Sequence, residues 1–175
     1  MARHQTMNVT GLRTVVWAAL GVGVIALPIV VPAPVRLVYN ATASVPVGWY
    51  AVVHVTTPRA GDVLLAHLPS SAATIANERH YLPRSVPILK RVGAVAGQSV
   101  CVRNGLVSVG VETPVQLLER DGHGRPLTPW PGCRALNAGE VFLLSHDSPS
   151  SFDSRYFGPI PKQLIIGRAV VLWTW

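Results

Sequence analysis

The hydrophobic pattern divides the chain into one long apolar stretch near its start and a longer region of short apolar runs. No charged residue occurs over 14–35, and the core at 15–31 is continuously apolar, VVWAALGVGVIALPIVV. A helix that crosses the hydrocarbon layer needs about 20 apolar residues, within a range of about 17–25. Pro28 and Pro32 would kink or end such a helix near its far side. The pattern therefore predicts a transmembrane helix over 14–35.

The residues around this stretch predict its orientation. Arg3 and Arg13 precede it, so the positive-inside rule places 1–13 in the cytoplasm and 36–175 outside it. A cleaved secretory signal is the alternative, because Ala41-Thr42-Ala43 has the small-x-small form of a cleavage site. The apolar run is longer than a typical signal core of about 7–15 residues, which favours an anchor. Both interpretations place 36–175 in an exported compartment.

The exported region has the pattern of a mainly β domain. Residues 69–87 are polar and proline-containing, which predicts a loop with one or two helical turns over 72–80. Asn104-Gly105, between two short apolar runs, predicts a hairpin with a two-residue type I′ turn. Further strands are expected in the apolar runs at 48–55, 63–68, 87–95, 140–145 and 163–173.

Composition and charge change this picture little. The chain is 49% hydrophobic and only 13% charged, which fits a membrane segment. A net charge of +7 raises nucleic acid or an anionic membrane surface as partners. The basic residues are scattered singly, so we expect a solvated surface and no nucleic acid partner. Of the 15 basic residues only Lys90 and Lys162 are lysines, and lysine, unlike arginine, can lose its proton near neutral pH.

The two cysteines, Cys101 and Cys133, both lie in the region expected to be exported. An isolated pair in an oxidising compartment most often forms a disulfide, so a structural bridge is predicted. No C-x-x-C or H-x-x-x-H spacing accompanies the pair, and neither a metal nor a cofactor is expected.

Candidate chemistry depends on Lys90. The chain has no G-x-S-x-G motif, and none of its six histidines sits in a recognisable triad setting. A neutral lysine amine can activate a serine instead, and burial among apolar side chains favours the neutral amine. On a strand, Lys90 would share a face with Ile88 and Val92. The alternative is a lysine at a solvated edge whose stem covers apolar surface.

The candidate nucleophile is Ser44, which lies in the segment TASVPVGWY. Pro46 pushes Val45 toward an extended backbone, and Gly48 permits a conformation that other residues resist. These residues predict a rigid, exposed turn just beyond the apolar stretch. An ordinary turn serine remains the alternative at this point.

Three separate motifs occur in one order along the chain: S-V-P-V-G-W-Y from Ser44, L-K-R-V around Lys90, and S-F-D-S-R-Y-F-G from Ser151. This set resembles the type I signal peptidase family. The first motif and the Tyr81-Leu82-Pro83 loop are more similar to the conjugal transfer (TraF-like) subgroup. The resemblance implies an antiparallel, signal-peptidase-like β domain with one N-terminal transmembrane helix.

The resemblance also implies roles for single residues. Ser44 would attack the scissile carbonyl, and Lys90 would act as its general base. The Ser44 backbone N–H and the Thr42 hydroxyl would form the oxyanion hole. Ser151 would orient the lysine amine. Two further residues, Asp153 and Arg155, would brace the site structurally.

The resemblance implies a serine endopeptidase anchored in the bacterial inner membrane, with its domain in the periplasm. Its expected partner is a precursor protein, a conjugative pilin, with possible cyclisation of the product. The chain departs from general signal peptidases in having Ser145-His146-Asp147 where they have G-D-N. The alternatives are a general signal peptidase, a non-catalytic component of the transfer apparatus and a self-cleaving regulator, which the lack of a DNA-binding motif disfavours.

Overall fold

The computed structural model describes residues 9–30, 34–110, 113–146 and 148–175. The chain divides into two compact units, Met1–Pro34 and Val35–Trp175. The first unit holds one helix, α1 (Val9–Val30). In the part of the chain that the structure describes, no helix combines the length and the hydropathy that crossing a membrane requires. The anchor over 14–35 and the cytoplasmic location of 1–13 stay predictions, and 1–8 and 31–33 lie outside the described residues.

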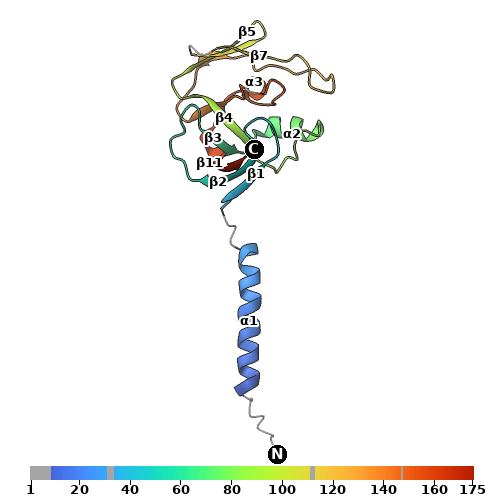
Figure 1. Ribbon diagram of the computed structural model, residues 1–175, viewed down its shortest axis with the longest axis vertical. Helices are drawn as coiled ribbons and strands as arrows, with labels where there is room; N and C mark the ends of the chain where they lie inside the picture. The colour runs from blue at the N-terminus through green and yellow to red at the C-terminus, as the bar shows by residue number, and fades with distance from the viewer. Residues whose placement is uncertain (1–8, 31–33, 111–112, 147) are drawn as a thin grey trace, which may run out of the picture. The chain divides into compact units, whose positions relative to one another are not determined.

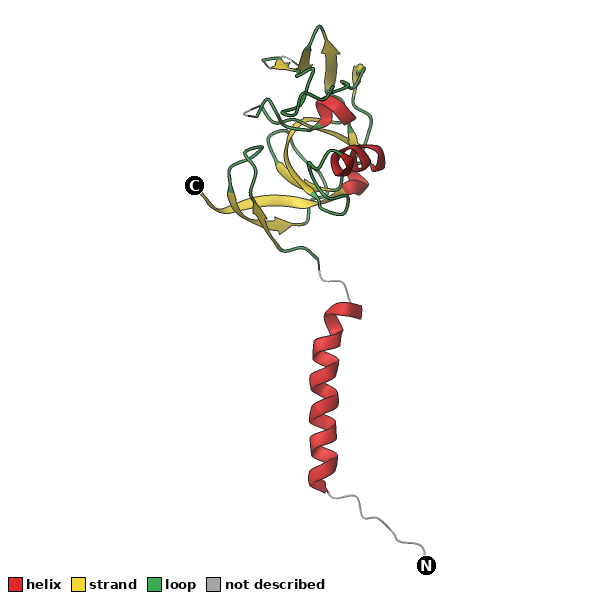
Figure 2. Ribbon diagram, turned by 90° about the vertical axis from the view of Figure 1, so that its right-hand side faces the viewer, coloured by secondary structure: helices red, strands yellow, loops and turns green. Residues whose placement is uncertain are grey.

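The second unit is mainly β, which confirms the fold class predicted from the short apolar runs. Among the described residues of this unit, two short α-helices interrupt the strands, and both lie on one side (Figure 2). In chain order the elements are β1 (Leu37–Asn40), β2 (Gly48–Val53), β3 (Val63–Ala66), α2 (Ser70–Glu78), β4 (Ile88–Val95), β5 (Ser99–Arg103), β6 (Leu106–Val109), β7 (Val115–Gln116), β8 (Cys133–Ala135), β9 (Glu140–Leu143), α3 (Ser154–Phe157), β10 (Ile160–Pro161), a 3-10 turn (Lys162–Leu164) and β11 (Ile165–Thr174).

The described strands form two antiparallel sheets. The larger has seven strands in the order β1-β2-β11-β3-β4-β9-β10, and the smaller has four in the order β7-β6-β5-β8. Strand β11 pairs with β2 along one part of its length and with β3 along another, so it holds the first and last parts of the unit together. The small sheet lies at one end of the unit and β1 and β2 at the other (Figure 1).

The β5–β6 hairpin and the disulfide of the small sheet follow from the sequence, whereas the short strands β7 and β8 were not predicted. Asn104 and Gly105 both have positive φ, 50° and 73°, which a type I′ turn requires, and they connect β5 to β6 as expected. Cys101 and Cys133 form the predicted disulfide and pair across β5 and β8. The sheet buries Val100 against residues from the end of β9 in one apolar cluster. This cluster packs the small sheet against β9 of the larger sheet.

A close backbone approach explains the glycine after the Ser44 turn. Gly48 has φ 150°, and a Cβ atom at this position would lie 2.1 Å from the carbonyl oxygen of Trp173 on β11. Any other residue would push β2 away from β11. Gly48 thus allows the turn that carries Ser44 to lie tightly against the sheet.

Candidate active site

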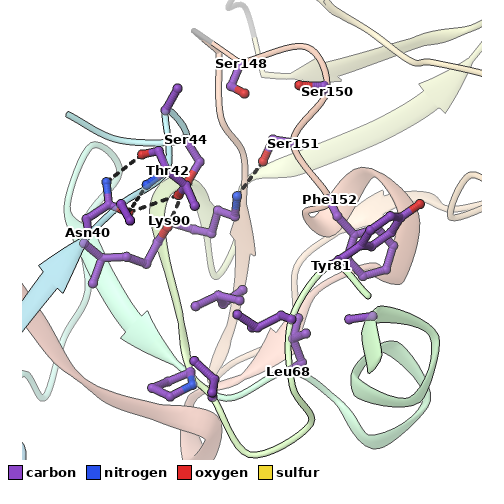
Figure 3. A pocket seen from close by; sticks show the side chains of 18 of the residues that line it. Asn40, Thr42, Ser44, Leu68, Tyr81, Lys90, Ser148, Ser150, Ser151 and Phe152 are labelled. Carbon is purple, nitrogen blue, oxygen red and sulfur yellow. Dashed lines mark hydrogen bonds between the residues drawn. The ribbon is translucent and has the colours of Figure 1, made fainter. Parts of the chain in front are cut away.

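A cavity of about 600 Å³ lies at the junction of the turn after β1, the start of β4 and the segment before α3 (Figure 3). Its lining is mostly apolar, from residues such as Leu68, Leu82 and Ile88. The polar residues that line it are Tyr39, Asn40, Thr42, Ser44, Tyr81, Lys90, Asp121, Ser148, Ser150, Ser151 and Tyr156. Ser44 and Lys90, predicted from separate motifs, therefore line one cavity.

Asn40, at the end of β1, holds the turn that carries Ser44. Its side-chain nitrogen lies 2.7, 2.9 and 3.1 Å from the backbone carbonyl oxygens of Thr42, Val45 and Pro46, respectively. Its side-chain oxygen accepts the Thr42 backbone N–H at 3.2 Å, an Asx turn. One buried amide thus bridges both ends of the Ser44 turn.

The Ser44 hydroxyl lies 3.1 Å from the Thr42 hydroxyl and 3.4 Å from the carbonyl oxygen of Leu89, which it can reach as a donor. The Thr42 hydroxyl donates to the side-chain oxygen of Asn40 at 3.0 Å. A hydroxyl has one proton, so Thr42 can only accept from Ser44 while it donates to Asn40, and Ser44 can donate either to Thr42 or to the Leu89 carbonyl. Thr42 would have to rotate before it could donate to an oxyanion.

Lys90 is held in β4 with only 7% of its surface exposed. Its Nζ donates to the Ser151 hydroxyl at 2.6 Å, in a buried hydrogen bond (Figure 3). Burial lowers the pKa of Lys90 to about 8; the Asp153 charge opposes this shift and the Arg155 charge adds to it. Of the two alternatives that the sequence left open, the structure shows the buried lysine and not the solvated edge lysine.

Ser44 and Lys90 line the same cavity but do not form a hydrogen bond with each other, since among the described residues none connects Ser44 Oγ to Lys90 Nζ. The Ser44 hydroxyl instead contacts the carbonyl of Leu89, the residue directly before Lys90 on β4. In structures without substrate, such contacts are often longer than in the reacting complex.

A fully buried ion pair supports this wall. Asp153 and Arg155 are both 0% exposed, and two guanidinium N–H groups donate to the two carboxylate oxygens at 2.8 and 2.9 Å. Arg155 also donates to the backbone carbonyls of Gln116, Ser148 and Ser151, each at 3.1 Å. The pair therefore fixes the backbone that carries Ser151, as its predicted bracing role requires.

Ser145 connects the parts of this wall. Its backbone N–H donates to Asp153 Oδ2 at 3.1 Å, and its hydroxyl donates to the Ser44 carbonyl at 3.1 Å. The Ser151 hydroxyl donates to the Ser145 hydroxyl at 3.3 Å. The neighbouring Asp147 lies outside the described residues.

The side of the cavity near Tyr81, which Figure 3 labels, holds a second polar cluster whose arginines are partly exposed. The Tyr81 hydroxyl donates to the carboxylate of Asp121. Arg125 forms an ion pair with the same carboxylate at 2.7 Å, and Arg79 lies 3.8 Å from it. This cluster ties the turn at 121–125 to the loop that follows α2.

The predicted site residues Thr42, Ser44, Lys90 and Ser151 all line the cavity, with the Asp153–Arg155 pair behind them. Sequence reasoning missed the contribution of Asn40. An asparagine two residues before Thr42 is a signal for an Asx turn and could have suggested it. Among the described residues, no cluster of three His, Cys, Asp or Glu side chains could bind a metal ion.

The model of the signal peptidase family, peptidase S26, matches residues 9–175. The chain belongs to this family. The chain is similar to the probable conjugal transfer protein TraF of Sinorhizobium fredii, 39% identical over 78% of this chain and 76% of the relative. The plasmid transfer protein TraF of Escherichia coli is 32% identical over 77% of this chain and 82% of the relative.

A signal peptidase I of Leptolyngbya laminosa is 31% identical over 67% of this chain and 54% of its own length. Among solved structures, a signal peptidase I from Enterococcus faecalis matches with 20% identity and a TM-score of 0.38, over 65% of this chain and 97% of the other. The resemblance to type I signal peptidases and to the TraF subgroup is therefore confirmed at the level of sequence.

Proposed function

We propose that the protein is a serine endopeptidase with a Ser44–Lys90 dyad that processes an exported precursor protein during conjugal transfer. One observation carries this proposal: the buried amine of Lys90 shares a cavity wall with Ser44 and donates to Ser151 at 2.6 Å. A lysine with a lowered pKa beside a serine hydroxyl is the arrangement that activates a serine without a histidine.

In the proposed reaction, Ser44 Oγ attacks the scissile carbonyl carbon while neutral Lys90 takes its proton. The Ser44 hydroxyl must first turn from the Leu89 carbonyl toward the amine. As the tetrahedral intermediate collapses, the C–N bond breaks, and the lysine gives its proton to the leaving amine. The acyl group is left as an ester on Ser44. Water, activated by the same amine, then hydrolyses this ester and restores the serine.

The backbone N–H of Ser44 and a rotated Thr42 hydroxyl would bind the oxyanion in this scheme. Removing one such donor in another serine peptidase costs about 2.7–4 kcal/mol of barrier. The Asn40 amide holds the backbone of Thr42 and of the residues after Ser44, so it would keep these donors in place.

For the substrate we propose a pilin precursor bound as an extended strand in the largely apolar cavity. The names of the relatives support a role in conjugal or plasmid transfer. If the amino end of the product replaces water at the ester, an amide bond forms, Ser44 leaves and the product becomes cyclic. Mass spectrometry of the product tests this cyclisation, because a cyclic product is one water molecule lighter than the linear one.

We propose in addition that 14–35 anchors the protein in the inner membrane with 36–175 in the periplasm. The support is the sequence, which has no charge over 14–35 and arginines on either side. Cell fractionation tests this proposal: the full chain should stay in the membrane pellet after alkaline carbonate extraction. A chain recovered in the soluble fraction would contradict the anchor.

The peptidase proposal is tested with two matched pairs of variants. Ser44→Ala and Lys90→Ala should each abolish shortening of an exported pilin precursor, followed by mass spectrometry. Ser108→Ala, in β6 of the small sheet, and Lys162→Ala, at the second lysine, should process it normally. Normal processing by either dyad variant would refute the proposed mechanism.

A general signal peptidase is the second candidate, and the similarity to the Leptolyngbya protein favours it. Depleting the protein from cells separates the two functions. Accumulation of many exported precursors would indicate a general peptidase, and a defect limited to conjugal transfer would indicate the specialised one. Transfer that is unaffected by Ser44→Ala and Lys90→Ala would indicate a non-catalytic component.

A further inference from the structure

A continuous chain of hydroxyl groups connects the lysine amine to the backbone of Ser44. Lys90 Nζ donates to Ser151 Oγ at 2.6 Å, and Ser151 Oγ donates to Ser145 Oγ at 3.3 Å. Ser145 Oγ then donates to the carbonyl oxygen of Ser44 at 3.1 Å. Ser145 and Ser151 are 2% and 6% exposed, so these protons depend mainly on protein partners.

The Ser44 carbonyl oxygen, the last acceptor, determines which way the hydroxyl protons of Ser145 and Ser151 point. A carbonyl oxygen can only accept, so the single proton of Ser145 must point toward Ser44. Ser145 can then offer only a lone pair to Ser151, which directs the single proton of Ser151 toward Ser145. Ser151 in turn can only accept from Lys90. The amine therefore contributes an N–H to Ser151 rather than its lone pair.

This direction matters because a neutral amine has one lone pair. If Ser151 donated its proton to Lys90, that lone pair would be occupied and could not receive the proton of Ser44. We propose that Ser145 is a positioning residue that directs the Ser151 proton away from Lys90 and so keeps the lysine lone pair open to Ser44. The inference rests on the proposed Ser44–Lys90 dyad and adds a residue to it.

The proposal predicts how Lys90 responds when Ser145 is replaced. In Ser145→Ala, the Ser151 hydroxyl loses its acceptor and is free to donate to the neutral amine. Hydrogen bonding to the neutral form lowers the pKa of a lysine. Asp153 and Arg155 are the charged groups that act on Lys90, and both remain in this variant. We therefore expect Ser145→Ala to lower the pKa of Lys90 by at least about half a unit.

The chain is well suited to measuring this shift because it has only two lysines, Lys90 and Lys162. Lysine labelled with carbon-13 at Cε gives two resonances in the full-length protein, and Lys162 serves as the internal reference. Titrations compare wild type with Ser145→Ala, Ser145→Gly and Ser145→Thr, which restores a hydroxyl. Ser108→Ala is the matched control in the small sheet. Two hydroxyl-free variants are included so that the result does not depend on one of them folding.

Precursor processing is measured on the same proteins at a pH where Lys90 is mostly neutral. We expect kcat to fall about tenfold in the hydroxyl-free variants, with little change in KM and recovery in Ser145→Thr. An unchanged Lys90 pKa in Ser145→Ala or Ser145→Gly would overturn the proposal, as would a lowered pKa with unchanged kcat. A purely structural role would lower stability without moving the Lys90 titration.

The two proposals fail differently. If Ser44→Ala still processes the precursor, the dyad fails whatever Ser145 does. If Ser44→Ala is inactive but Ser145→Ala matches the Ser108→Ala control in both measurements, only the role of Ser145 fails.

Discussion

Two aspartate–arginine ion pairs support different parts of the cavity lining, and they differ in burial and in the segments they hold. On the Ser44 side, Asp153 and Arg155 are both 0% exposed. On the Tyr81 side, the side chain of Arg125 is 34% exposed, although Asp121 is only 7% exposed. The inner pair supports the backbone beneath the proposed dyad, and the outer pair joins two surface loops.

The two arginines differ in how firmly they hold the backbone around them. Arg155 makes hydrogen bonds to three backbone carbonyls besides its ion pair, so removing it takes a donor from three carbonyls and from the buried Asp153 carboxylate. Arg125 donates to one carbonyl, that of Arg79, and water can replace much of its contact. Similar chemistry therefore gives a fixed wall behind the lysine and an adjustable rim opposite.

The same substitution in both ion pairs tests whether they contribute differently to stability. Arg155→Met leaves the Asp153 carboxylate buried without its partner, and we expect a loss of about 3–5 kcal/mol of stability. Urea unfolding followed by fluorescence measures it, with Arg125→Met as the matched control. In the double variant Asp153→Leu/Arg155→Met part of the loss should return. Equal midpoints for Arg155→Met and Arg125→Met would refute the distinction between the two sides.

A second prediction concerns the other support of the Ser44 side. Asn40→Ala removes the amide that faces three backbone carbonyls of the Ser44 turn. Leaving such buried groups unpaired costs about 1–3 kcal/mol. Processing should fall more than this loss of stability explains, because the turn no longer holds Ser44. Asn104→Ala in the β5–β6 turn is the control, and it should lower stability without a specific loss of processing.

How far the sequence predicts the site can be judged from particular residues. The Asn104-Gly105 hairpin was predicted correctly because it needs only its own turn conformation. The apolar strand around Lys90 left a buried lysine and a solvated edge lysine open, and the structure decides for burial. The contact of Ser145 with the Ser44 carbonyl joins positions 101 residues apart. No local pattern encodes such a contact, because it depends on how β9 packs beside the β1–β2 turn.

The resemblance placed Thr42 and Ser151 correctly at the cavity, but it did not give the direction of their hydrogen bonds. Thr42 gives its proton to Asn40, a residue outside the motifs. The direction of a hydroxyl proton depends on every neighbouring acceptor, and these come from distant segments. The roles of single hydroxyls therefore required the structure.

A third prediction uses the pH dependence of the Ser44 side. Because the pKa of Lys90 is lowered to about 8, the amine is mostly protonated at neutral pH. The rate constant kcat/KM should rise about tenfold per pH unit below this value and level off above it. Stability should also rise with pH between this value and the ordinary lysine pKa of 10.5, since the unfolded chain then binds more protons. Lys90→Arg should be inactive at every pH tested, because arginine keeps its proton.

The smallest effect is expected on the Tyr81 side. Arg125→Met should shift the unfolding midpoint only slightly, because the Arg125 side chain is partly exposed and Asp121 keeps its hydrogen bonds from Tyr81 and from the backbone N–H groups of His123 and residue 125. The loop at 121–125 lines the cavity through Asp121, so loosening it should raise KM for a precursor while kcat stays near that of wild type. Arg103→Met, on the small sheet, is the control and should change neither constant. A fall in kcat as large as that of Asn40→Ala would mean that the outer cluster also positions the dyad, and the division of the cavity into a fixed wall and an adjustable rim would be wrong.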